Sequence, residues 1–157
     1  MKLLIGLGNP GTKYLKNRHN AGHMLIDSIT NNSNNANIQL LKTNTFMNDS
    51  GKFVKKAVSS EQLAVSDLYI AHDDLDLKIG SYKIQLGVGP KVHYGIQSVE
   101  KELGTKDFWR IRLGVDNRDP NNRISGEEYV LQDFTSEELG ILDKVYEEIR
   151  NNLSQLK

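Results

Sequence analysis

Residues 2–20 read KLLIGLGNPGTKYLKNRHN, an apolar stretch that leads into a glycine-rich turn and then reaches a histidine. The apolar residues 3–5 predict a short buried strand. Asn9 precedes a proline and is therefore biased away from the helical basin, so the turn presents it at the end of that strand. The layout predicts a site at a strand's carboxyl end, where Asn9 and His19 face one crevice and the imidazole titrates near neutral pH.

The chain has 157 residues, no cysteine and a formal net charge of zero. Its length suits one domain with a sizeable core, and the lack of cysteine excludes disulfides and thiolate zinc sites. No apolar run reaches the roughly 18 residues of a membrane span. Residues 3–5 predict a strand in place of a signal peptide, so we expect a soluble cytoplasmic protein.

The charge distribution leaves two interpretations open. A zero net charge is not typical of a nucleic-acid-binding domain. Residues 127–148 are mostly acidic, however, and several basic residues lie in or near the glycine-rich segments: Lys13, Lys16, Arg18, Lys52, Lys55, Lys56, Lys83, Lys91, Arg110 and Arg112. The neutral total either conceals a basic face or reflects an ordinary mixed surface.

Strand and helix patterns alternate along the chain. Strand patterns cover residues 3–5, 38–41, 68–71, 81–86 and 109–115. Helical patterns cover residues 19–29, 45–58, 95–103 and 135–156. Thr43 is expected to cap the second helix, and Thr135 with Glu138 forms a capping box for the last.

The asparagine-rich tract at residues 31–37 is too polar for a core element and is predicted to be a surface loop. The chain contains neither internal repeats nor a domain linker. An alternation of strands and helices of this kind is typical of α/β proteins. The sequence therefore predicts one domain over residues 1–157, a three-layer α/β/α fold with a mixed central sheet.

The glycines of residues 6–11 are compatible with three kinds of structure. They fit the G-x-G-x-x-G pattern of dinucleotide-binding sites. That fit is weak, because Pro10 lies inside the motif, the helix begins too late to cradle a phosphate, and Asp27 falls within a helix. The glycines could also form a simple tight turn, with His19 as a surface or capping histidine, or they could belong to a catalytic site.

Polar side chains at three later element boundaries favour the catalytic interpretation. They are Asn48 in KTNTFMNDSG, Asp73 in AHDDLDL and His93 in HYG. Open α/β sheets gather their sites beyond the strand ends. Together with a histidine, these groups supply the base, the orienting carboxylate and the amide donors that hydrolysis of an activated carbonyl requires.

Each of these residues also has a simpler explanation when it is taken alone. Asn48 could form a turn, Asp73 could be a solvated acid after a strand, and His93 could be a helix cap. A metal site is another alternative, although no His-x-x-x-His pair supports it. Its ligands would be His72, Asp73, Asp74 and Asp76.

The chain resembles the bacterial-type peptidyl-tRNA hydrolases over nearly its whole length. The motifs that carry the resemblance occur in the family's order: GLGNPG, RHNAG, TFMNDSG, HDDLDL, GVGPKVHYG, FWRIRLGV and YVLQDF. The resemblance implies a cytoplasmic esterase that cleaves the bond between a peptide and the 3′ ribose of tRNA, without metal or cofactor. Its partner would be peptidyl-tRNA. We expect a monomer, because a neutral, compact domain without an exposed heptad seam gives no reason for more.

The resemblance also implies roles for individual residues. The general-base histidine corresponds to His19, and the aspartate that orients it corresponds to Asp73. Asn9 corresponds to the asparagine that distinguishes blocked from free aminoacyl groups, and Asn48 to a substrate-binding asparagine. Other residues match positions that line the cleft: Tyr14, Phe46 and His93.

The chemistry of an ester agrees with these roles. An ester has a good alkoxide leaving group, so neither a covalent nucleophile nor a metal is obligatory. A positioned histidine such as His19 can accept a proton from the attacking water, which is worth roughly 10² to 10⁴ in rate. Asp73 would fix the tautomer of the imidazole and stabilise its cation.

The chain departs from the family at several positions. The asparagine-rich tract replaces a longer segment, and the chain stops at Lys157 without the family's basic extension. Tyr94 replaces an expected substrate-binding asparagine. Gln85 replaces a lysine that binds tRNA phosphates, while its partner Arg112 remains. With fewer phosphate contacts, we expect weaker tRNA binding that is lost at lower salt concentration, unless Lys83 or Lys91 substitutes. These changes leave a second hypothesis, a catalytically degenerate paralogue that binds RNA 3′ ends or another partner.

Overall fold

A computed structural model describes residues 1–32 and 37–157. Within these residues one five-stranded sheet has the strand order β2-β1-β3-β5-β4. Its strands are β1 (Lys2–Gly6), β2 (Ile38–Lys42), β3 (Leu68–Lys78), β4 (Tyr82–Leu86) and β5 (Trp109–Asp116). The neighbouring strands are parallel except β4 and β5, which are antiparallel, so the predicted mixed sheet is confirmed.

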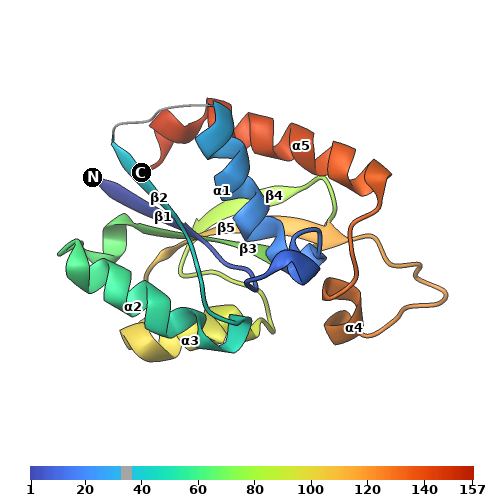
Figure 1. Ribbon diagram of the computed structural model, residues 1–157, viewed down its shortest axis with the longest axis horizontal. Helices are drawn as coiled ribbons and strands as arrows, with labels where there is room; N and C mark the ends of the chain where they lie inside the picture. The colour runs from blue at the N-terminus through green and yellow to red at the C-terminus, as the bar shows by residue number, and fades with distance from the viewer. Residues whose placement is uncertain (33–36) are drawn as a thin grey trace.

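Helices cover both faces of this sheet (Figure 1). One face is covered by α1 (Ala21–Asn32) and α5 (Ser136–Asn151), and the other by α2 (Ser50–Ser60) and α3 (Tyr94–Leu103). The predicted α/β/α layering is therefore confirmed. A short helix that the sequence did not predict, α4 (Gly126–Val130), precedes α5. None of the helices in the described residues is long and apolar enough to cross a membrane.

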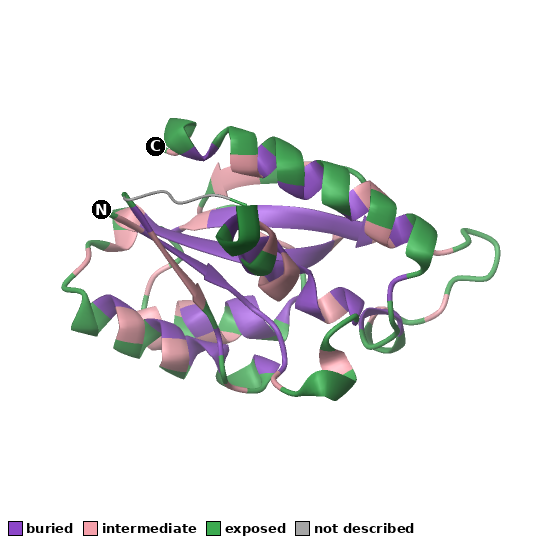
Figure 2. Ribbon diagram, turned by 45° about the horizontal axis from the view of Figure 1, so that its top comes forward, coloured by how far each residue is buried: buried purple, intermediate pink, exposed green. Residues whose placement is uncertain are grey.

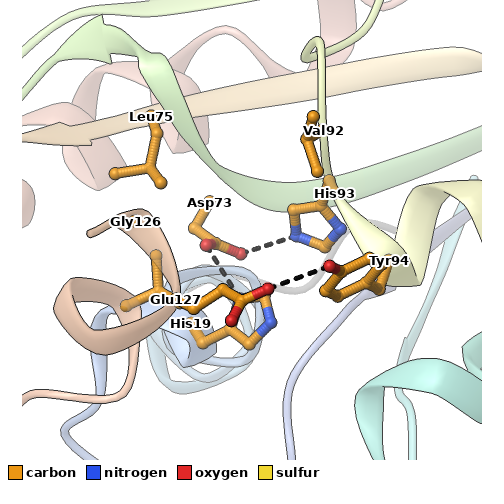
Figure 3. Close-up of a pocket in the computed structure, with 9 residues that line it drawn as sticks. His19, Asp73, Leu75, Val92, His93, Tyr94, Gly126 and Glu127 are labelled. Carbon is orange, nitrogen blue, oxygen red and sulfur yellow. Dashed lines mark hydrogen bonds and ion pairs between the residues drawn. The ribbon is translucent and has the colours of Figure 1, made fainter.

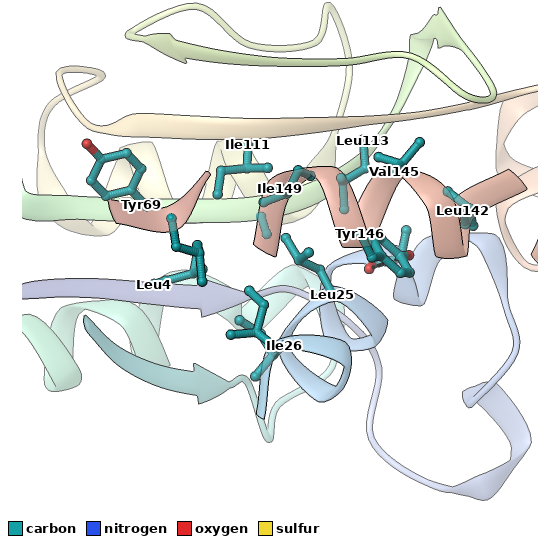
Figure 4. Close-up of a cluster of buried hydrophobic side chains, with 14 of the residues drawn as sticks. Leu4, Leu25, Ile26, Tyr69, Ile111, Leu113, Leu142, Val145, Tyr146 and Ile149 are labelled. Carbon is teal, nitrogen blue, oxygen red and sulfur yellow. Dashed lines mark hydrogen bonds between the residues drawn. The ribbon is translucent and has the colours of Figure 1, made fainter. Parts of the chain in front are cut away.

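Alternating strand residues build two separate cores. Leu4 of β1 points toward α1 and α5, whereas its neighbours Leu3 and Ile5 point toward α2 and α3. Figure 2 shows the buried strands between helices that are buried on one side only. Figure 4 shows side chains of α1 and α5 gathered against the sheet. Because full burial of a leucine-sized side chain contributes about 1.5–3 kcal/mol, these cores hold the strand ends of the site in place.

A close contact between β1 and α1 fixes the start of the first helix. A Cβ atom on Gly6 would lie 2.3 Å from the carbonyl oxygen of Gly22. The backbones of β1 and α1 can therefore approach this closely only because Gly6 has no side chain. Gly11 has a φ of 101°, a conformation that favours glycine. The GLGNPG motif therefore brings the segment before α1 against the end of β1.

The second helix begins later than its sequence pattern predicts. It starts at Ser50 and follows a 3-10 turn over Met47–Asp49, so the predicted start at residue 45 is wrong. Thr43 is not its cap. The Thr43 hydroxyl instead accepts a hydrogen bond from the Gly8 backbone N–H at 3.3 Å, because the segment after β2 packs on the glycine-rich turn.

The third strand is longer than predicted. It runs on to Lys78, so His72, Asp73 and Asp74 lie within β3 and do not follow it. Pairing with β5 explains the difference, since Asp73 lies opposite Leu113 and satisfies its backbone groups there.

The ends of α1 and α5 also differ from the sequence pattern. Asn31 and Asn32 of the predicted loop continue α1, whereas residues 33–36 lie outside the described residues. The capping box of Thr135 and Glu138 is confirmed. The predicted terminal helix, however, ends at Asn151 and is followed by a 3-10 turn.

Candidate active site

Three elements bring a carboxylate and two imidazoles together at the carboxyl end of the parallel strands. His19 lies in a 3-10 turn immediately before α1, Asp73 lies in β3, and His93 is the N-cap of α3. The Asp73 side chain is buried, with the residue 2% exposed. Its Oδ2 accepts a hydrogen bond from His19 Nδ1 at 2.8 Å, and its Oδ1 accepts one from His93 Nε2 at 2.8 Å (Figure 3).

The hydrogen bonds of His93 determine where its proton lies. Its Nδ1 accepts a hydrogen bond from the Ile96 backbone N–H at 3.1 Å, so its Nε2 carries the proton that is donated to Asp73. Both oxygens of the carboxylate are thus occupied, and the side chain of Asp73 is held in one orientation. The simpler explanation of His93 as a helix cap is confirmed, and the structure adds a direct contact between His93 and the Asp73 carboxylate.

The same logic leaves one nitrogen of His19 free. Because Nδ1 donates to Asp73, Nε2 keeps its lone pair and is the atom that can accept a proton from water. Burial disfavours the imidazolium, but the charge and the hydrogen bond of Asp73 outweigh burial and raise the pKa of His19 above 6.5. Burial would raise the pKa of Asp73, yet the two histidines hold it well below its usual value. Asp73 is therefore ionised and stabilises the cation.

His72 lies next to this cluster but does not share its chemistry. It is fully buried, and burial lowers its pKa to about 3. Its Nδ1 donates to the backbone carbonyl of Asp73 at 2.8 Å, and its ring lies 5.3 Å from that of His93. His72 therefore stays neutral and packs behind the carboxylate.

A buried network around Arg18 holds the turn that carries His19. The guanidinium of Arg18 donates to Glu138 at 2.8 Å and lies 3.9 Å from the ring centre of Tyr129. Its backbone N–H also donates to the carbonyl of Gln132. These contacts tie the residue before His19 to α4 and α5. No sequence pattern predicts this role, although RHNAG and the capping box each contain one of the two charged partners.

Asn9 is held by hydrogen bonds on three of its four polar atoms. Its backbone N–H and carbonyl pair with the side chain of Asn20, and its Oδ1 accepts from the Met47 backbone N–H at 2.8 Å. The amide is thereby oriented. Its Nδ2 has no partner among the described residues and is left as a donor for a ligand.

The outer part of the cleft contains most of the other predicted residues. It is a cavity of about 380 Å³ that reaches from His19 to the loop before α2. The rings of Tyr14 and Phe46 meet edge to face there, with their centres 6.3 Å apart. Asn9 and Asn48 line the same cavity. The structure therefore brings these predicted residues together around His19.

The inner part of the cleft is smaller and mostly apolar. It measures about 260 Å³, and its floor is formed by His19, Asp73 and His93. Tyr94 lies at its rim, where its hydroxyl donates to Glu127 Oε1 at 2.9 Å (Figure 3). Tyr94 thus faces the cleft, and its partner Glu127 is a lining residue that the sequence analysis did not identify.

Arg112 lies apart from these cavities. Its Nε donates to Asp74 at 2.7 Å and its Nη1 to Gln85 at 2.8 Å, and the residue is 7% exposed. Gln85, which replaces the family's lysine, therefore contacts the arginine directly. Nη2 is the donor that Arg112 retains for an external group. Its contact with tRNA stays a prediction.

A metal ion could be held by His19, Asp73 and His93, whose ligand atoms lie within 4.8 Å of one another. In this structure the same atoms are joined by hydrogen bonds, in which the Asp73 carboxylate accepts from both imidazoles. The alternative ligand set does not converge. Asp74 pairs with Arg112, and Asp76 accepts from the backbone of Lys91.

The fold and the site define a class of protein, an α/β domain with a hydrogen-bonded histidine–aspartate pair at the open end of its sheet. Comparisons with known proteins identify the family. The peptidyl-tRNA hydrolase family profile matches residues 3–157. The chain belongs to the peptidyl-tRNA hydrolase family. This assignment removes support from the dinucleotide interpretation of the glycine-rich turn.

Individual relatives agree with this assignment. A peptidyl-tRNA hydrolase of Pseudothermotoga lettingae is 38% identical over 92% of this chain and 84% of its own length. One from Desulfitobacterium hafniense is 35% identical over 92% of this chain and 86% of its own length. The crystal structure of peptidyl-tRNA hydrolase from Acinetobacter baumannii superposes with a TM-score of 0.87 at 26% identity, and covers 99% of this chain and 88% of that one.

Proposed function

We propose that the protein is an active peptidyl-tRNA hydrolase in which His19 is the general base. The observation that carries the proposal is the 2.8 Å hydrogen bond from His19 Nδ1 to a carboxylate whose other oxygen is occupied by His93. This bond fixes the tautomer in which Nε2 is free at the surface of the cleft. A base with a raised pKa is suited to accept a proton from water near neutral pH.

The reaction proceeds by direct attack of water on the ester. Water adds to the carbonyl carbon while Nε2 of His19 accepts one of its protons, and Asp73 stabilises the resulting imidazolium. The bond between the carbonyl carbon and the ribose oxygen then breaks. His19 returns the proton to that oxygen, which leaves a free peptide carboxyl group and a tRNA with a free ribose hydroxyl.

Amide donors orient the substrate in the outer cavity. Nδ2 of Asn9 is available there because its other polar atoms are engaged. Asn48 is exposed at the same cavity and can bind a peptide carbonyl. A peptide amide pairs with such groups, whereas the charged amino terminus of an ordinary aminoacyl-tRNA leaves them unpaired, and this favours N-blocked substrates.

The proposed substrate also indicates where in the cell the protein acts. Peptidyl-tRNA is produced where translation occurs, so we propose that the protein acts in the cytoplasm. We further propose that it acts as a monomer, since the groups that the proposed reaction needs, His19, Asp73 and Asn9, all come from one chain. The alternative of a degenerate paralogue has no support in the comparisons, whose relatives are named as hydrolases.

An assay of tRNA deacylation tests the proposal. The protein is incubated with N-acetylated and unblocked aminoacyl-tRNA, and His19→Ala is the comparison variant. We expect the variant to lose about 10² to 10⁴ in rate on the blocked substrate, the usual contribution of a positioned base. If the wild-type protein cleaves neither substrate faster than His19→Ala, the degenerate paralogue is the better hypothesis. Equal cleavage of both substrates would keep the base and remove the role of Asn9.

A further inference from the structure

The contact between Tyr94 and Glu127 crosses the cleft where its two cavities meet. Both cavities are lined by His19, Tyr94, Glu127 and Val130, so the hydrogen-bonded pair lies at their common border. Tyr94 comes from the first turn of α3 and Glu127 from the first turn of α4. Because His19 lines both cavities, a substrate bound at Nε2 of His19 can place different groups on the two sides of this pair.

The inner cavity suits an uncharged side chain. Its walls beyond the catalytic groups are largely aliphatic, formed by Leu75, Val92 and Val130, and no amide side chain lines it. The outer cavity instead offers the amides of Asn9 and Asn48 beside aromatic rings. Such groups suit the peptide main chain and the sugar and base of the nucleotide. The group left for the inner cavity is the side chain next to the ester.

Glu127 adds a charge to this border. Among the described residues no cation pairs with Glu127, and its side chain accepts a hydrogen bond from the Tyr94 hydroxyl. The other carboxylate of the inner cavity, Asp73, is neutralised in part by the imidazoles of His19 and His93. Glu127 is therefore the acid whose charge is least compensated there. An acidic side chain entering the inner cavity would meet this charge at the rim.

We propose that the inner cavity receives the side chain of the amino acid esterified to tRNA, and that Glu127, held in place by Tyr94, disfavours peptides that end in an acidic residue. This inference rests on the proposed function. It names Glu127 as a specificity determinant and the preferred substrates as peptidyl-tRNAs whose last residue is apolar or uncharged. Glu127 touches no reacting atom in this scheme, so its effect is on the choice of substrate.

Two substrates of equal shape test the proposal. One tRNA body is acylated with N-acetylglutamine or with N-acetylglutamate, and kcat/KM is measured for each. We expect the wild-type protein to favour glutamine by about tenfold, a size that one like-charge contact near a protein surface can supply. Glu127→Gln should bring the ratio close to one. Tyr94→Phe should give an intermediate ratio, because the carboxylate is no longer held at the border.

Glu128→Gln is the matched control. Glu128 is the next residue of α4, is exposed and lines neither cavity. We expect that removal of the Glu128 charge leaves the glutamine-to-glutamate ratio of kcat/KM at the wild-type value. The proposal is overturned if Glu127→Gln keeps the wild-type ratio, or if Glu128→Gln lowers the ratio equally, since a general surface charge would then explain the preference.

Amide-linked analogues separate this inference from the proposed function. The affinities of the amide-linked N-acetylglutamine and N-acetylglutamate tRNAs are measured for the same three variants and the wild-type protein. If turnover does not exceed that of His19→Ala, the proposed function fails, while the ratio of affinities still decides the role of Glu127. The same loss of preference in Glu127→Gln alone supports the inference, and an unchanged ratio overturns it.

Discussion

Two neighbouring acids of β3 belong to two ion-pair clusters that differ in which atoms they leave open to ligands. Asp73 binds His19 and His93, whereas Asp74 binds Arg112, which also donates to Gln85. Both carboxylates are almost fully buried. The first cluster leaves Nε2 of His19 facing a cavity, and the second directs most of its donors inward. The difference teaches that burial and ion pairing indicate a proton-transfer site only when the atom left open can accept a proton, as Nε2 of His19 can and the guanidinium of Arg112 cannot.

Successive residues of a strand point to opposite faces, and this explains how adjacent acids can serve such different clusters. Asp73 faces the segment before α1, and Asp74 faces the side chains of β5 and β4. Substitutions in the two clusters should therefore separate loss of activity from loss of stability.

The largest loss of activity is expected for Asp73→Asn. An asparagine amide in place of the carboxylate can accept from one histidine but must present an N–H to the other, so the tautomer of His19 is no longer fixed. We expect kcat/KM to fall by about 10² to 10⁴ with the fold retained, which circular dichroism and deacylation kinetics together measure. Asp74→Asn is the comparison in the other cluster and should not produce this loss.

The pH dependence of kcat/KM for Asp73→Asn tests the same comparison between the two clusters. In the wild-type protein, kcat/KM should rise with pH through the pKa of His19, which lies above 6.5 because of Asp73. Burial alone lowers the pKa of an imidazole, so the residual activity of Asp73→Asn should rise at lower pH. The His19–Asp73 pair stabilises the folded protein at pH values below the pKa of histidine in the unfolded chain. This stabilisation is lost as the pH rises through the pKa of His19 in the folded protein. An identical acid limb in both proteins would contradict the assignment of His19.

A smaller effect, on stability instead of chemistry, is expected for Arg112→Ala. Removal of the guanidinium leaves the buried Asp74 carboxylate without its partner, which typically costs about 3–5 kcal/mol of unfolding free energy. Urea denaturation measures this cost. The double variant Arg112→Met with Asp74→Leu removes both charges and should recover much of it. If Arg112→Ala lost activity without losing stability, the second cluster would be part of the catalytic site.

The smallest effect concerns the salt dependence of tRNA binding. Arg112 can offer Nη2 to one phosphate, so Arg112→Gln should reduce the slope of log K against log salt by about 0.7–0.9. Binding to uncharged tRNA at several salt concentrations gives this slope. Lys83, the cross-strand neighbour of Arg112, serves as the comparison. A reduction for Lys83→Gln alone would show that the lysine has taken over the phosphate contact.

The sequence predicted the layers of the fold correctly because these depend on local patterns. Alternating apolar residues identified the strands, and the capping box at Thr135 identified the start of α5. Boundaries that depend on tertiary contacts were less accurate. Thr43 has the composition of a helix cap, but its hydroxyl is used by the glycine-rich turn. β3 extends through His72 and Asp73 because β5 continues to pair with it.

By itself the sequence determined the class of fold and the family, and it marked His19 and Asp73 as candidate site residues, because short ordered motifs and hydrophobic periodicity are properties of neighbouring residues. Only the tertiary structure decided how side chains far apart in the chain meet. Arg18 reaches Glu138 across 120 positions, and Tyr94 reaches Glu127 across 33. Such contacts depend on how the whole chain packs around the sheet, and no local pattern specifies them.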